Sequence, residues 1–96
     1  MDTEERTAFA SLRDTSRELY DLLKRGLLAI SQYAAEHDST GVAMLQQQYG
    51  THLQMLRHQY VQLKELQLRH PNDSDVLNAV INCDAYFADL REQSPT

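Results

Sequence analysis

One cysteine and four histidines are the side chains in this sequence best suited to nucleophilic or metal chemistry, and their spacing supports neither. Cys83 shares a helical stripe with Val80 and Phe87, which predicts a buried thiol that packs as a small apolar side chain. His52 and His58 stand six residues apart, on different sides of a helix, and no Glu-x-x-His pair occurs. Glycine-flanked serines and glycine-rich phosphate loops are also missing from the sequence. We therefore expect no catalytic residue, no metal ligand and no cofactor.

The charged residues show a more specific arrangement, a basic stripe on one flank of the first predicted helix. Its four members fall within about 40° of one another at about 100° per residue. Two interpretations remain open: the stripe pairs with acidic residues of its own chain, or it docks an acidic segment of a partner. Asp84 bears on this choice, because it lies in the apolar arc of the last helix and a carboxylate there needs a partner. We expect it to contact Arg13, Arg17 or Lys24. The basic stripe consists of Arg6, Arg13, Arg17 and Lys24.

Apolar residues recur at helical spacing along nearly the whole chain, so the sequence predicts an all-α fold. With 96 residues, the chain is expected to form one domain, residues 1–96. The expected helices span residues 3–37, 40–69 and 74–91, and residues 92–96 are expected to form a frayed tail.

Two polar segments separate the expected helices. HDSTG supplies capping side chains and a glycine for the first turn, and Pro71 ends the second helix because the residue before a proline avoids the α region. Thr15 and Glu18 have the spacing of a capping box, so a break near Asp14 is the alternative to a continuous first helix.

Helix lengths predict the architecture. At 1.5 Å per residue the first two helices are about 50 and 45 Å long, whereas the third reaches only about 27 Å. The short turns then give a long antiparallel hairpin with a shorter third helix beside it, a three-helix bundle whose third helix leaves one hairpin end uncovered. Flexible Met, uncharged Gln and an aromatic ring at that end are typical of an adaptable contact surface. The predicted partner interface consists of Leu27, Leu28, Tyr33, Met44 and Gln48.

Composition and charge exclude several partners. The net charge is -5, and residues 71–96 hold five acidic side chains against one basic. This balance repels a phosphate backbone, so no nucleic acid partner is expected. No apolar run approaches the roughly 20 residues that span a bilayer, so no membrane contact is expected either. The acidic amino terminus and the single cysteine indicate the cytoplasm.

These features favour a non-enzymatic protein–protein interaction module that acts by helix packing. By architecture alone the chain is similar to small helical adaptors, export chaperones and assembly subunits. The expected partner is another protein chain, either a second copy or a different protein. The alternative is a small acidic inhibitor or immunity protein that blocks an enzyme through its acidic C-terminal helix.

Overall fold

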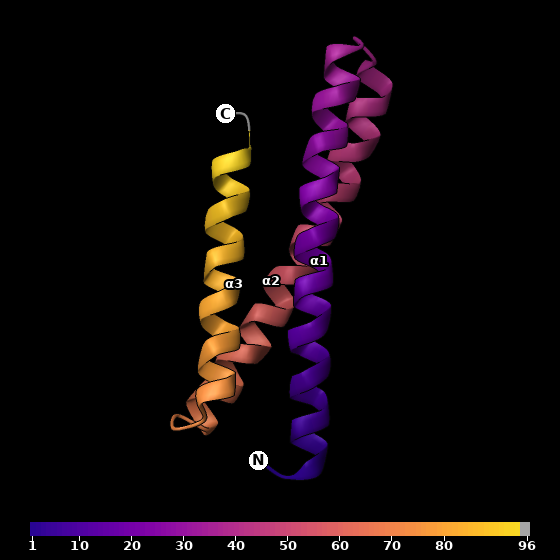
Figure 1. Cartoon of the computed structure of the whole chain (residues 1–96). Helices are drawn as coiled ribbons and strands as arrows, with labels where there is room; N and C mark the ends of the chain where they lie inside the picture. The colour runs from indigo at the N-terminus through magenta and orange to yellow at the C-terminus, as the bar shows by residue number, and fades with distance from the viewer. Residues whose placement is uncertain (95–96) are drawn as a thin grey trace.

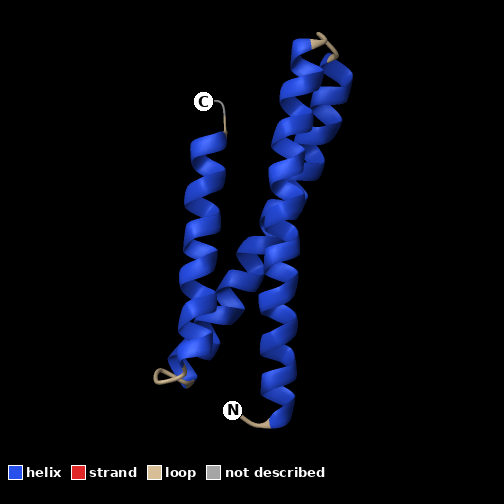
Figure 2. Cartoon of the chain, in the orientation of Figure 1, coloured by secondary structure: helices blue, strands red, loops and turns tan. Residues whose placement is uncertain are grey.

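The computed structural model describes residues 1–94 and shows three α-helices (Figures 1 and 2). The predicted all-α fold, a helical hairpin with a shorter third helix, is confirmed. Each helix boundary lies within two residues of its predicted position, and α3 continues through residues 92 and 93, which were expected in the tail. Residues 95 and 96 of that tail lie outside the described residues. The helices are α1 (Thr3–Ala35), α2 (Ser39–Arg69) and α3 (Ser74–Gln93).

An aspartate caps the start of every helix and accepts hydrogen bonds from backbone amides of the first turn. In the α1–α2 turn the residue with left-handed backbone is His37, at φ 58°, whereas Gly41 is helical. A Cβ at position 41 would lie 2.7 Å from the Asp38 carboxylate, so the glycine leaves room for the cap. α1 passes unbroken through Asp14, and the alternative of a break there is wrong. The three caps are Asp2, Asp38 and Asp73.

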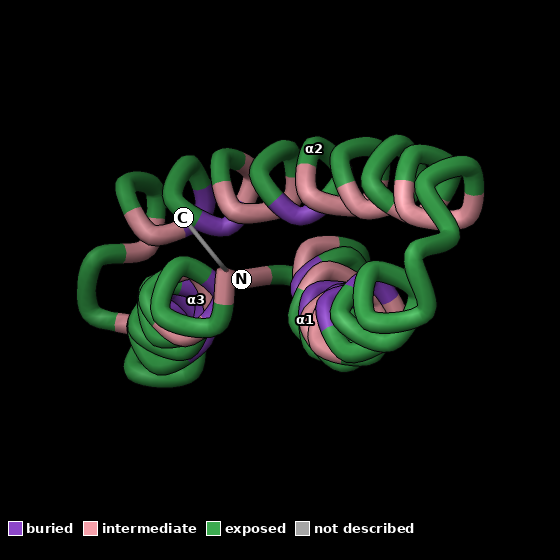
Figure 3. Tube along the Cα trace, turned by 90° about the horizontal axis from the view of Figure 1, so that it is seen from above, coloured by how far each residue is buried: buried purple, intermediate pink, exposed green. Residues whose placement is uncertain are grey.

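α1 and α2 form the long hairpin, and α3 runs parallel to α1 (Figure 1). α2 follows an oblique path: its C-terminal half packs against α3 and its N-terminal half lies alongside α1 (Figures 1 and 3). The molecule is elongated, with extents of 51 × 22 × 15 Å. All three helices pack together from the start of α1 to the middle of the molecule. We call the part around the starts of α1 and α3 the closed end (residues 1–16 and 60–83), and the hairpin tip beyond α3 the open end (residues 28–48).

Apart from Ile30, the buried apolar side chains of residues 1–94 form two clusters, and they lie where the helices face one another (Figure 3). Phe9, Leu63, Leu66, Val76, Ala79, Val80 and Cys83 form the cluster at the closed end. Leu19, Leu23, Leu27, Leu56 and Leu90 form the second cluster, in the middle of the molecule.

A buried polar contact involves all three helices. Ser16 of α1 is 1% exposed and donates a hydrogen bond to Oε1 of Gln59 on α2, at 3.1 Å. Burial raises the pKa of the Cys83 thiol of α3, and a hydrogen bond with Ser16 partly offsets this rise. Because a buried hydroxyl without a partner is costly, this contact favours one longitudinal register of the three helices.

Candidate protein-interaction surfaces

The structure separates the five residues predicted to form the partner interface. Leu27 is 8% exposed and packs in the middle cluster, so its assignment to an exposed interface was wrong. Leu28 is 66% exposed on the neighbouring flank, because one residue turns a helix by about 100°. Tyr33 lies about 140° from Leu28 around α1, on the other side of the hairpin. Met44 and Gln48 of α2 are exposed on the same side as Tyr33.

Tyr33, Met44 and Gln48 belong to a larger surface, on the side of the hairpin that faces away from α3. On α1, Leu22 precedes Gly26 by four residues and Tyr33 follows Gly26 by seven, so all three share one side. On α2, Met44 precedes Gln48 by four residues and Met55 follows it by seven, so these three residues also share one side. We call this surface the uncharged face: Leu22, Gly26, Ala29, Tyr33, Met44, Gln48 and Met55.

The uncharged face combines exposed apolar side chains with a hollow between the helices. The exposed fractions are 42% for Leu22, 41% for Tyr33, 59% for Met44 and 46% for Met55. A shallow groove of about 220 Å³ separates α1 from α2 and includes Leu22, Ala29 and Gln48 in its lining. Gly26 and Ala29 have little or no side chain, so the Tyr49 ring of α2 packs close to Gly26: a Cβ at position 26 would lie 3.6 Å from it. The groove can therefore receive side chains from a second surface.

Charge is almost excluded from this face. Between Asp38 and Arg57, residues 39–56 of α2 contain no Asp, Glu, Lys or Arg, and its glutamines 46–48 are all exposed. On α1 the charged residues at the outer edge of this face are Glu18 and Arg25, and Arg25 also lines the groove. The sequence analysis missed Leu22, Gly26, Ala29 and Met55. Their spacing from Tyr33 and Gln48, together with the uncharged stretch of α2, carried the signal.

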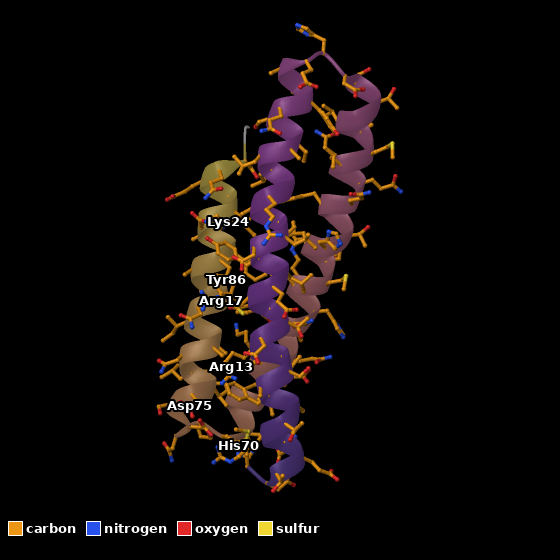
Figure 4. The ribbon with its side chains drawn as sticks, turned by 45° about the vertical axis from the view of Figure 1, so that its right-hand side comes forward. Arg13, Arg17, Lys24, His70, Asp75 and Tyr86 are labelled. Carbon is orange, nitrogen blue, oxygen red and sulfur yellow. The ribbon has the colours of Figure 1, made fainter. Side chains whose placement is uncertain are left out.

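The basic stripe lies on the flank of α1 nearest to α3. Figure 4 shows three of its members along the seam between these helices, with an acidic and an aromatic residue of α3 beside them. Arg6, the fourth member, is exposed near the start of α1. The residues labelled along this seam are Arg13, Arg17 and Lys24 of α1, with Asp75 and Tyr86 of α3.

Among residues 1–94, Arg13 is the member of the stripe that forms an ion pair within the chain. Its Nε lies 3.0 Å from the Asp14 carboxylate, and both side chains are at least half exposed. Lys24 Nζ lies 5.2 Å from the centre of the Tyr20 ring, within the range of a cation–π contact. Among residues 1–94, no carboxylate lies within 4.0 Å of the charged groups of Arg6, Arg17 or Lys24. Docking of an acidic segment on the stripe stays a prediction.

Two tyrosine–carboxylate hydrogen bonds join α3 to the hairpin. The Tyr20 hydroxyl of α1 donates to Asp89, and the Tyr60 hydroxyl of α2 donates to Asp84. Each hydrogen bond, together with burial, raises the pKa of its tyrosine to about 12. The hydrogen bond from Tyr20 also lowers the pKa of Asp89.

The expected contact between Asp84 and the basic stripe was wrong. Asp84 follows the inward-facing Cys83, and the helical turn of about 100° directs it toward α2, where it is exposed and meets Tyr60. Asp89 lies on the opposite flank of α3, beside α1, and Lys24 contributes to the lowering of its pKa.

Neither a membrane span nor a metal site is found in residues 1–94. No helix there combines the length and apolar character needed to cross a bilayer. No three His, Cys, Asp or Glu side chains in this part of the chain are grouped so that they could hold a metal ion. Comparison with protein-family models, curated protein sequences and solved structures found no match to this chain.

Proposed function

We propose that this chain is a non-enzymatic protein-interaction module, acting in the cytoplasm, that binds another helical protein chain through the uncharged face. The supporting observation is that exposed Leu22, Tyr33, Met44 and Met55 follow one side of the hairpin with charge only at its outer edge. Single exposed apolar residues are ordinary on proteins, whereas a continuous apolar surface is typical of contact sites. Interface cores are likewise enriched in Met and aromatic residues and depleted of charge.

Helix packing is the mode of binding that this shape favours. The groove beside Gly26 and Ala29 lies between two nearly antiparallel helices, so side chains at spacings of three and four on a partner helix can enter it. The glutamine amides around it adapt to donors or acceptors on the partner. Adaptors, export chaperones and assembly subunits all use contacts of this kind.

The alternative, an inhibitor that acts through an acidic α3, has less support. Asp73 caps α3, and Asp84 and Asp89 accept hydrogen bonds from tyrosines. Three of the five acidic residues in residues 71–96 therefore already stabilise the fold.

The test places two lysines on the uncharged face, in Leu22→Lys/Met55→Lys. The matched control, Leu28→Lys/Leu68→Lys, makes the same change in charge at two apolar positions that are 66% and 82% exposed elsewhere on the surface. Circular dichroism verifies folding, sedimentation measures self-association, and quantitative affinity capture from the source cells measures heterologous binding. We expect a loss of about tenfold or more in binding for the face variant alone, because two desolvated charges would oppose the contact.

The outcomes also distinguish the two kinds of partner. If sedimentation shows a dimer that only the face variant dissociates, the partner is a second copy. If captured proteins are lost only with the face variant, the partner is a different chain. Equal self-association and equal capture for the face variant and its control would show that this face is not an interface.

A further inference from the structure

A second groove lies on the other side of the hairpin, between α2 and the C-terminal half of α3. Its volume is about 390 Å³, and the helices that border it diverge toward the open end (Figure 1). Tyr49, Leu53 and Tyr60 of α2 line one wall, and Phe87 and Leu90 of α3 line the other. We call these five residues, with Arg57 and Arg91 at the rim, the aromatic groove.

The residue types in the aromatic groove are those that dominate binding energy in protein interfaces. Tyr60 and Phe87 meet edge to face with their ring centres 5.4 Å apart, and so form a rigid aromatic base. Tyrosine and arginine are enriched among the residues whose truncation weakens binding most. Tyr49 and Leu53 are only partly buried, so α3 leaves part of the apolar stripe of α2 open to a further contact.

The rim of the groove is positively charged, in a chain whose net charge is -5. Within residues 1–94 neither Arg57 nor Arg91 has a carboxylate within 4.0 Å. Lys64 Nζ, 5.2 Å from the centre of the Tyr60 ring, adds a third positive charge nearby. The acidic residue next to this groove, Asp84, accepts the hydrogen bond from Tyr60. The groove thus offers an apolar base and three cations, Arg57, Arg91 and Lys64, beside the single negative charge of Asp84.

We propose that the aromatic groove binds an acidic amphipathic α-helix of another protein. The groove lies where α2 and α3 diverge, so a helix seated there would pack against both of them. Its apolar side would cover Tyr49, Leu53 and Phe87, which are partly buried. Carboxylates on its flanks would meet Arg57 and Arg91, with the charge-assisted hydrogen bonds that arginine forms. Tyr49 lines both this groove and the groove of the uncharged face, but the two grooves open on different sides of the hairpin and this proposal does not depend on the proposed function.

The experiment selects ligands from a displayed library of helical peptides, each with a fixed stripe of Leu, Ile and Phe and with flanking positions that are Glu, Gln or Lys. The full chain is the target. We expect Glu to be enriched at the flanks and the affinity of the selected peptides to fall with rising salt concentration. The best peptide is then measured by fluorescence anisotropy against variants.

Arg57→Glu/Arg91→Glu should lower the affinity for that peptide about tenfold or more, since each substitution replaces attraction with repulsion. Arg6→Glu/Arg25→Glu, with the same change in charge on α1, should leave the affinity within about twofold. Phe87→Ala should lower the affinity for an acidic peptide and for a Gln-flanked peptide by the same factor, because both peptides contact the apolar base of the groove. Since Arg57 and Arg91 are exposed, thermal unfolding of their variant should match that of the parent.

Three results would overturn the proposal. The first is enrichment of Lys or Gln at the flanks, or no enrichment of any peptide. The second is an equal loss of affinity in the two double arginine variants. The third is a parent dimer that Arg57→Glu/Arg91→Glu dissociates in sedimentation, since the occupant would then be a second copy. Failure of the uncharged-face test affects none of these readouts.

Discussion

The closed and open ends share one hairpin, yet only the closed end has a third helix over it. At the closed end, Leu63 and Val76 are 0% exposed. His70 Nε2 also lies 2.8 Å from Glu5 there, and this hydrogen bond lowers the pKa of Glu5. At the open end, residues 28–48, Ile30 is the single buried residue. The apolar stripe continues through both ends, so the third helix decides whether it becomes core or surface.

This difference shows how a small chain can separate stability from binding. Burial is the main source of folding free energy, and it concentrates where three helices meet. The remaining hairpin has one helix–helix seam and two exposed sides, both of which keep apolar side chains. One side is the uncharged face, and the other continues from the aromatic groove.

The strongest test of the comparison truncates one core residue at each end. Leu63→Ala should lower the free energy of unfolding by about 3 to 4 kcal/mol, because three helices surround the site and relax little around the cavity. Ile30→Ala should cost about 2 kcal/mol, at the low end for this substitution, since a hairpin with one seam can adjust and water already reaches its edge. Urea unfolding of both variants gives the values. Equal losses would show that the open end has a core of its own.

A smaller effect tests the packing at the centre of the three helices. Cys83 is 1% exposed, so Cys83→Ala should cost roughly 1 kcal/mol and the native thiol should react slowly. Burial, which raises the pKa of the thiol, slows the reaction further. Ala43→Cys in the Cys83→Ala background places a thiol at an exposed position of the open end and should react at the rate of the unfolded chain. Fast reaction of native Cys83 would contradict its burial.

Local sequence rules predicted the secondary structure well. Capping side chains, Pro71 and helical periodicity placed all the helix boundaries within two residues, because these signals act over one or two turns. Helix lengths also predicted that α3 leaves part of the hairpin uncovered. Helix boundaries and lengths depend on residues that are neighbours in the sequence, so the sequence alone is enough to predict them.

The surfaces were harder to predict, because they depend on where the neighbouring helices lie. Periodicity shows which residues share a side of a helix, but the oblique path of α2 from α3 to α1 leaves no mark in the apolar pattern. Leu27 was therefore assigned to the surface although it packs against the hairpin partner. Asp84 was expected beside α1 and instead meets α2, whereas Asp89, for which the sequence analysis predicted no contact, lies beside α1. About 140° of helical rotation separates the two residues, and only the packed structure shows which flank faces α1.

The smallest expected effect concerns the hydrogen bonds that join α3 to the hairpin at Tyr20 and Tyr60. In the unfolded chain these tyrosines ionise near the ordinary pKa of 10.0, and in the folded chain near about 12. The folded state thus keeps its protons to higher pH, and the stabilisation is complete below pH 10 and declines as the pH rises toward 12. On the acid side, the lowered pKa of Asp89 means that its contribution is lost as the pH falls below 3.8.

Tyr20→Phe/Tyr60→Phe should therefore have a lower free energy of unfolding at pH 7, by about 0.5 kcal/mol for each hydrogen bond lost at these partly exposed positions. Its midpoint of urea unfolding should be slightly lower for the same reason. Between pH 10 and 12 the stability of this variant should fall less steeply than that of the parent, because it lacks the two tyrosine hydroxyls whose ionisation is coupled to unfolding. Tyr33→Phe, on the uncharged face, serves as the control and should keep the parental slope. Tyr20→Phe alone should also increase amide exchange in the last turn of α3, where Asp89 meets α1 at the border of the open end. An unchanged alkaline slope in the double variant would show that these hydrogen bonds do not stabilise α3 on the hairpin.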